Sequence, residues 1–69
     1  MTKTTINKIN TARKLAQKAW REGFNELADL YIQLATGLLE GDAMIYHDDF
    51  YKMMIEVDGY NRDDYNKVM

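Results

Sequence analysis

The sequence predicts an all-α fold, a small three-helix bundle that leaves room for a short fourth helix at the C-terminus. Apolar residues recur three and four positions apart along most of the chain, which is the spacing of an amphipathic helix. Glycines stand where the periodic stretches end, as they commonly do at helix C-termini. The chain of 69 residues has no proline and 46% hydrophobic residues, which favours one folded domain over residues 1–69. The expected helices cover residues 5–22, 25–40, 43–58 and, at the C-terminus, 62–67.

The first helix is expected over residues 5–22, after an N-cap at Thr4 or Thr5. Gly23 ends it and Asn25 caps the next helix, so the turn is tight and the two helices should form an antiparallel hairpin. The side expected to be buried carries Ile6, Ile9, Ala12, Ala16, Ala19 and Trp20. The opposite side is basic and includes Lys14, Lys18 and Arg21.

The central helix, expected over residues 25–40, has the widest apolar surface in the chain. One stripe consists of Leu27, Leu30, Tyr31, Leu34 and Leu38, and a second consists of Ala28, Ile32, Ala35 and Leu39. A helix with so wide an apolar surface must pack against two neighbours. We therefore expect the alanines of the first helix on one side, and Phe50, Met54 and Val57 of the third helix on the other.

The residues around the first turn, 19–28 followed by Tyr31 and Leu34, resemble a single tetratricopeptide-type helical hairpin. An aromatic residue, a glycine, an aromatic, an alanine and an aromatic follow one another there in the order of that family. The resemblance covers residues 19–38 and lacks the closing proline and a second copy of the repeat. The same stretch is also similar to three-helix microtubule-interacting-and-trafficking domains. Both resemblances imply a helical hairpin, and an ordinary helix–glycine–helix hairpin packs the same residue types near its turn.

The third helix is expected over residues 43–58, between a cap at Asp42 and a terminating Gly59. The last ten residues leave two alternatives open. Asn61 with Asp64 three residues later forms a capping signature that favours a short helix over residues 62–67. A frayed end is the alternative, because chain termini are commonly loose.

The composition excludes several classes of protein. The absence of cysteine rules out disulfides and thiolate metal sites. The N-terminal residues lack the apolar run of a signal peptide, and no stretch is long enough to cross a membrane, so we expect a cytoplasmic protein with no membrane partner. The net charge of −2 hides an asymmetry, since residues 1–24 are basic and residues 25–69 are acidic.

The sequence offers little for catalysis. His47, the only histidine, stands next to Asp48 and Asp49, but neighbouring residues on a helix point about 100° apart and do not converge on one ion. The chain has no serine and no glycine-rich phosphate loop, and a three-helix domain of this length has little room for a substrate pocket. We therefore expect no enzyme, no catalytic residue, no cofactor and no metal site.

The strongest indication of function is apolar surface that three helices cannot cover. Met44, Tyr51 and Ile55 extend the apolar side of the third helix, next to Asp48 and Asp49, and these five residues form the predicted protein interface. Methionine suits such interfaces because its side chain is flexible and polarizable.

The sequence leaves two alternatives for what covers this surface. The C-terminal residues, with Tyr60, Tyr65 and Val68, can fold back over it, or a second chain can cover it. The second chain is favoured, most commonly as a two-fold homodimer.

The sequence therefore favours a small acidic protein that regulates or inhibits a partner protein by occupying its surface, as phage-type inhibitors do by analogy. One alternative is a nucleic-acid-associated helical module that uses Lys14, Lys18 and Arg21, although the isoelectric point of about 5.2 argues against a dedicated nucleic-acid binder. The other alternative is a structural assembly subunit.

Overall fold

The computed structural model describes residues 2–41 and 47–68, apart from the side chain of His47. Within these residues all regular secondary structure is helical, which confirms the predicted all-α class. Its four helices are α1 (Lys3–Arg21), α2 (Asn25–Glu40), α3 (His47–Ile55) and α4 (Arg62–Val68). None of them is long and apolar enough to cross a membrane.

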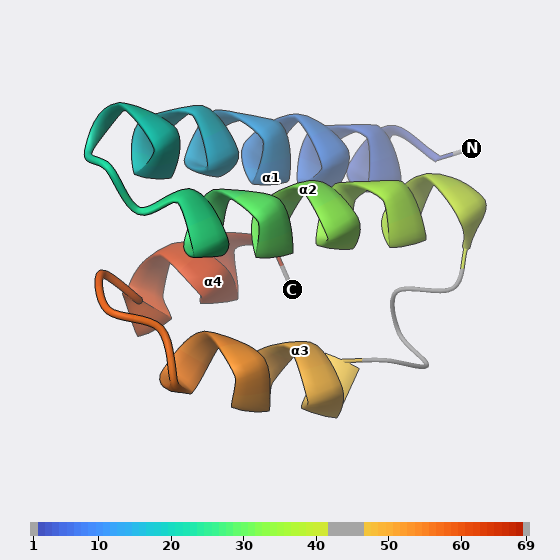
Figure 1. The fold of residues 1–69 in the computed structure, drawn as a ribbon. Helices are drawn as coiled ribbons and strands as arrows, with labels where there is room; N and C mark the ends of the chain where they lie inside the picture. Colours follow the sequence, from blue (N-terminus) through green and yellow to red (C-terminus); the bar gives the residue numbers. More distant parts are fainter. Residues whose placement is uncertain (1, 42–46, 69) are drawn as a thin grey trace.

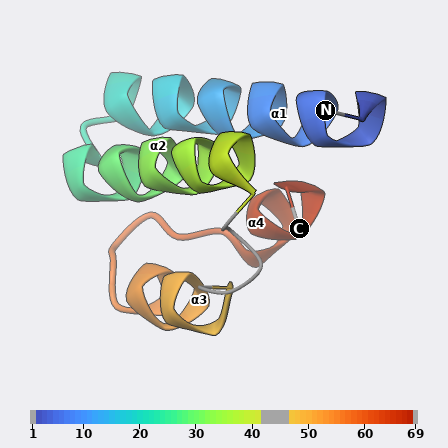
Figure 2. The same cartoon turned by 90° about the vertical axis from the view of Figure 1, so that its right-hand side faces the viewer.

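The hairpin of α1 and α2 is the framework of the molecule (Figure 1). The two helices lie antiparallel and in contact along their length, whereas α3 and α4 both lie on one side of the hairpin (Figure 2). Helix α4 packs against α1, and α3 packs against α2. The hairpin therefore has one side covered by α3 and α4 and another side that the described residues leave uncovered.

Helix α1 begins earlier than predicted because Thr2 caps it. The Thr2 side-chain oxygen accepts a hydrogen bond from the backbone N–H of Thr5 at 3.2 Å. This interaction satisfies one of the free N–H groups of the first turn, so the helix starts at Lys3, before the predicted cap at Thr4 or Thr5.

Two residues of α1 that were expected in the core are exposed. Ile6 is 45% exposed and Trp20 is 70% exposed. Ile6, Arg13, Gln17 and Trp20 follow one another at spacings of seven, four and three residues, so they form one stripe on α1. This stripe lies beside the buried side of the helix. The buried residues of α1 are Ile9, Ala12, Ala16 and Ala19.

The turn between α1 and α2 is as tight as predicted. Gly23 adopts a φ of 85°, a left-handed conformation that other residues seldom adopt, and the N–H of Phe24 bonds to the carbonyl of Ala19 at 2.8 Å. Helix α2 covers the predicted range of residues 25–40. Asn25 is its first helical residue and not its cap, since Phe24 holds the cap position without a side-chain hydrogen bond.

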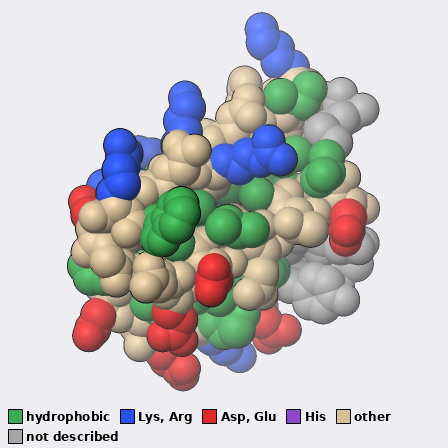
Figure 3. All heavy atoms as spheres, turned by 45° about the horizontal axis from the view of Figure 1, so that its top comes forward, with side chains coloured by type: hydrophobic (Ala, Val, Ile, Leu, Met, Phe, Trp, Pro, Cys, Tyr) green, Lys and Arg blue, Asp and Glu red, His purple; other side chains and the backbone are tan. Residues whose placement is uncertain are grey.

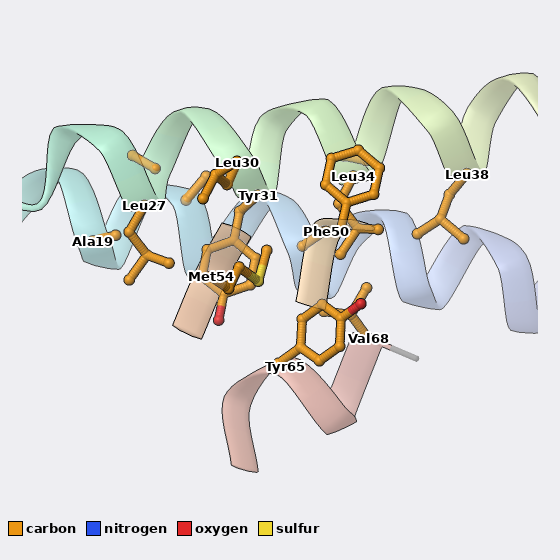
Figure 4. Packing of buried hydrophobic residues seen from close by; sticks show 14 of the residues in the cluster. Ala19, Leu27, Leu30, Tyr31, Leu34, Leu38, Phe50, Met54, Tyr65 and Val68 are labelled. Carbon is orange, nitrogen blue, oxygen red and sulfur yellow. The ribbon is translucent and has the colours of Figure 1, made fainter. Parts of the chain in front are cut away.

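Helix α2 is the centre of the core. Its buried residues are Leu27, Ala28, Leu30, Tyr31, Leu34, Ala35 and Leu38. Phe50 and Met54 of α3 point toward it, as predicted, and Val57 is half-buried against the same cluster (Figure 4).

The C-terminal residues fold back over this core as helix α4, one residue longer than the predicted range. The Asn61 side-chain oxygen accepts the N–H of Asp63 at 2.9 Å, which begins the helix. Tyr65 and Val68 are fully buried against the α1–α2 hairpin (Figure 4). The chain's own tail therefore covers Tyr51 of the surface for which a second chain was favoured, whereas Ile55 of that surface is 55% exposed.

Helix α3 is shorter than the predicted range. It ends at Ile55 instead of 58, and residues 43–46 of the predicted range lie outside the described residues. The backbone N–H groups of Glu56 and Val57 bond to the carbonyls three residues earlier, at 3.2 Å each. The helix thus tightens and ends in turns of the 3₁₀ type.

Candidate protein-binding surface

The uncovered side of the α1–α2 hairpin gathers most of the exposed apolar side chains. Six large hydrophobic side chains are exposed among the described residues, and four of them belong to α1 and α2. We call their side of the hairpin the outer face and define it by Ile6, Trp20, Ile32 and Leu39. Figure 3 shows hydrophobic side chains gathered on this side of the molecule, with Lys and Arg toward one edge and Asp and Glu toward the other. Exposed apolar side chains that gather on one side of a soluble protein can mark an interaction site.

A groove of about 510 Å³ runs between α1 and α2 on the outer face. Ala16 and Ala28, each 4% exposed, form its floor, because their small side chains let the two helices approach closely. Trp20, 70% exposed, and Ile32, 52% exposed, stand along its sides. The groove therefore offers a shallow apolar channel with a large aromatic side chain beside it.

The outer face arises from helical spacing. Ile32 and Leu39 are seven residues apart on α2, and Ile6 and Trp20 share a stripe on α1 with Arg13 and Gln17. The sequence interpretation placed Ile6 and Trp20 in the core and did not single out the outer face. Arg13 and Gln17 were the available signal, because polar residues on the same stripe indicate a side in contact with solvent.

The two sides of the groove carry opposite charge. Helix α1 has six lysines and arginines and no acidic residue, whereas α2 has three acidic residues and no basic one. At the groove itself, Arg13 lies on the α1 side and Asp29 on the α2 side, and both are exposed. Within the described part of the chain the ion pairs involve other residues, so both charges remain available to a partner.

The structure describes four of the five residues of the predicted interface, and they lie on different stripes of α3. Asp48 and Ile55, seven residues apart, share one stripe of α3, and both are exposed. Asp49 lies on a different stripe with Met53, where both line a hollow of about 470 Å³ near α2. Met44 lies outside the described residues.

Tyr51, the remaining member of that interface, is half-buried in a cluster of tyrosines. Its ring centroid lies 6.2 Å from that of Tyr60, nearly perpendicular to it, and 5.6 Å from that of Tyr65. Such edge-on and tilted arrangements are the favourable ones for aromatic pairs. Tyr51 therefore joins α3 to α4 and the chain between them.

Burial controls the acid–base behaviour of the tyrosines. Burial, with a smaller contribution from Asp64, raises the pKa of Tyr31 to about 12. Burial, together with Tyr60, raises the pKa of Tyr65 to about 12, and burial likewise raises the pKa of Tyr60. These phenols stay uncharged at neutral pH and act as core residues.

The three basic residues of the nucleic-acid alternative lie four and three residues apart on α1, and one of them is paired within the chain. Lys14 and Arg21 are exposed on α1. The Nζ of Lys18 lies 3.2 Å from Oδ2 of Asp64, and the Nζ of Lys67 lies 3.5 Å from the other oxygen of the same carboxylate. Lys18 therefore joins α1 to α4, which leaves it less available to a phosphate.

Metal ligands do not gather in the part of the chain that the structure describes, since no three His, Cys, Asp or Glu side chains there could hold an ion together. The side chain of His47 lies outside the described residues.

Comparisons with known proteins found no match for this chain among protein-family models, curated proteins or solved structures. The resemblance of residues 19–38 to a tetratricopeptide hairpin stays a prediction.

Proposed function

We propose that the protein is a small non-enzymatic regulator or inhibitor that binds a partner protein through the outer face. The observation that supports this most strongly is Trp20, 70% exposed beside the groove between α1 and α2. Tryptophan is among the residues that contribute most to protein–protein binding, and burying so large a side chain contributes strongly to affinity. An exposed tryptophan on an apolar face is therefore more readily explained by a binding role than by folding.

The groove suits an amphipathic helix of the partner. A helix laid between α1 and α2 would place apolar residues at spacings of three, four and seven against Trp20 and Ile32. Its flank over α1 would be acidic and its flank over α2 basic, because the two helices carry opposite charges.

Outer-face variants test this function. We expect Trp20→Ala and Ile32→Ser to lose a partner that the unchanged protein captures from its source cell. With the purified partner, the loss should be roughly 30-fold or more in Kd, measured by calorimetry, as for other interface hot spots.

The matched control is Ile55→Ser on α3. Ile55 is 55% exposed and Ile32 52%, so the two substitutions remove similar exposed surface. We expect Ile55→Ser to retain the partner. If Ile55→Ser loses the partner while Trp20→Ala and Ile32→Ser keep it, the binding surface is the α3 interface predicted from the sequence, and the outer face is the wrong site.

A further inference from the structure

We propose that a second copy of this chain occupies the outer face in the free protein, as a two-fold dimer that a partner protein must displace. This inference rests on the proposed function, because it concerns the regulation of the same surface. It follows from three properties of the outer face: its charge pattern, its shape and its area.

The charge pattern is self-complementary. A two-fold axis parallel to the helices turns one outer face onto another and exchanges their sides, so α1 of each copy lies against α2 of the other. The basic helix of each copy then faces the acidic helix of the other. Arg13 and Asp29 line the same groove from opposite sides, so this exchange brings them toward each other at two symmetric positions.

The shape is complementary in the same arrangement. Trp20 is a large side chain that stands out from α1, and Ala28 lies on the floor of the groove near the same end of the hairpin. The exchange of sides places Trp20 of each copy over the α2 side of the other copy's groove. The protruding residue thus meets the surface where small side chains leave room for it.

The area is close to that of a standard interface. The molecule measures 32 × 22 × 18 Å, and the outer face runs along its longest dimension. A face of 32 × 18 Å to 32 × 22 Å covers at most roughly 600–700 Å², against about 800 Å² per partner in typical stable complexes. An interface at or below the low end of the standard size suits a dimer that a partner protein can displace.

Charge reversal provides a test that does not depend on the loss of a large side chain. In Arg13→Glu alone, and in Asp29→Arg alone, two like-charged pairs replace the two attractive pairs. We expect sedimentation equilibrium to show roughly tenfold weaker dimerisation for each variant. An equimolar mixture of the two variants should regain the dimerisation of the unchanged protein, because each heterodimer again holds two attractive pairs.

Two controls separate this effect from misfolding and from net charge. Lys52→Glu and Glu56→Arg make the same charge changes at exposed positions outside the outer face, so we expect both to leave dimerisation unchanged. Circular dichroism melts should show that all four variants fold.

The dimer is overturned if the unchanged protein stays monomeric at high micromolar concentration, or if the mixture associates as weakly as the single variants. The proposed function fails independently if Trp20→Ala and Ile32→Ser retain the partner. A monomer whose outer-face variants still lose the partner refutes only the dimer. A dimer whose outer-face variants keep the partner refutes only the proposed function.

Discussion

The two sides of the α1–α2 hairpin are built from the same helices and yet meet different surroundings. On the covered side, Leu34 is fully buried beneath residues from α3 and α4. On the outer face, Ile32, two residues earlier on the same helix, is 52% exposed. The difference arises because the covering helices are short: among the described residues α3 and α4 have nine and seven residues, whereas α1 and α2 have 19 and 16. The second half of the chain can cover one side of the hairpin, and the apolar surface of α2 extends beyond it.

The covered side is held by contacts that the outer face lacks. Tyr65 and Val68 of α4 are fully buried, Lys18 of α1 pairs with Asp64 of α4, and Tyr51 packs against Tyr65. The ion pair is partly exposed, since the Lys18 side chain is 50% accessible, so it contributes little to stability and more to the position of α4. Burial of the apolar residues supplies most of the stability on this side.

The largest expected difference between the two sides is in the cost of removing an aliphatic side chain. We expect Leu34→Ala to lower the free energy of unfolding by about 2–5 kcal/mol, because it leaves a cavity in the core. Ile32→Ala should lower it by roughly 0.5 kcal/mol or less, because the side chain is already half in water. Urea unfolding at a concentration where the protein is monomeric measures both. Similar losses for the two variants would show that the outer face is packed in the monomer.

The second largest effect is expected at alkaline pH, which should lower the free energy of unfolding through tyrosines of the covered side. The folded protein holds the phenol protons of Tyr31 and Tyr65 up to a pKa of about 12, and the unfolded chain releases them near the ordinary value of 10.0. Their contribution is therefore complete below pH 10 and is lost as the pH rises toward 12. At about pH 11 the expected loss is about 1.4 kcal/mol for each tyrosine.

Urea unfolding at about pH 9 and 11, with the absorbance of tyrosinate followed in parallel, checks this expectation. Tyr65→Phe should be less sensitive to the pH change than the unchanged protein, because it has no phenol proton to release. An equal loss of stability in both would assign the alkaline effect to other groups.

The elements that the sequence predicted best are those with the longest regular pattern. The range 25–40 predicted for α2 agrees with the structure. Apolar residues recur regularly over these sixteen positions, and the helix ends at Gly41, which has a φ of 81°. Helix α4 was one of two alternatives, and Asn61 does cap it, although its side chain accepts the N–H of Asp63 and the predicted signature named Asp64. Helix α3 is shorter than predicted because its last turn tightens, and apolar periodicity does not report that change.

The candidate site was harder to predict from sequence. A stripe of apolar residues shows that a helix side is apolar, but not whether another element covers it. Trp20 lies next to the buried stripe of α1, so its position on the helix is compatible with the core. Its exposure follows from where the short helices α3 and α4 pack, which is a property of the whole chain and not of α1. The contacts of Tyr51, which was predicted at an interface, with Tyr60 and Tyr65 depend in the same way on how the helices pack and not on α3 alone.

The smallest expected effect concerns the contact between the hairpin and the connection that joins α3 to α4. Gly59, between α3 and α4, and Gly23, between α1 and α2, both adopt a left-handed conformation, with φ of 89° and 85°. A Cβ atom at Gly59 would lie 2.7 Å from the ring of Phe24, whereas one at Gly23 would meet nothing within 4 Å. Gly23→Ala should therefore cost only the backbone strain, about 1 kcal/mol, and Gly59→Ala roughly 1 kcal/mol more.

The difference between the two variants isolates the contact of the α3–α4 connection with Phe24, because the backbone term is common to both. Phe24→Ala should cost less in the Gly59→Ala background than in the unchanged protein, since it removes the Cγ and Cδ atoms that the added methyl group would meet. Thermal unfolding of the single and double variants measures this coupling. If Gly59→Ala costs no more than Gly23→Ala, the connection is free to move away from Phe24, and the covered side depends on Phe50, Met54, Tyr65 and Val68 alone.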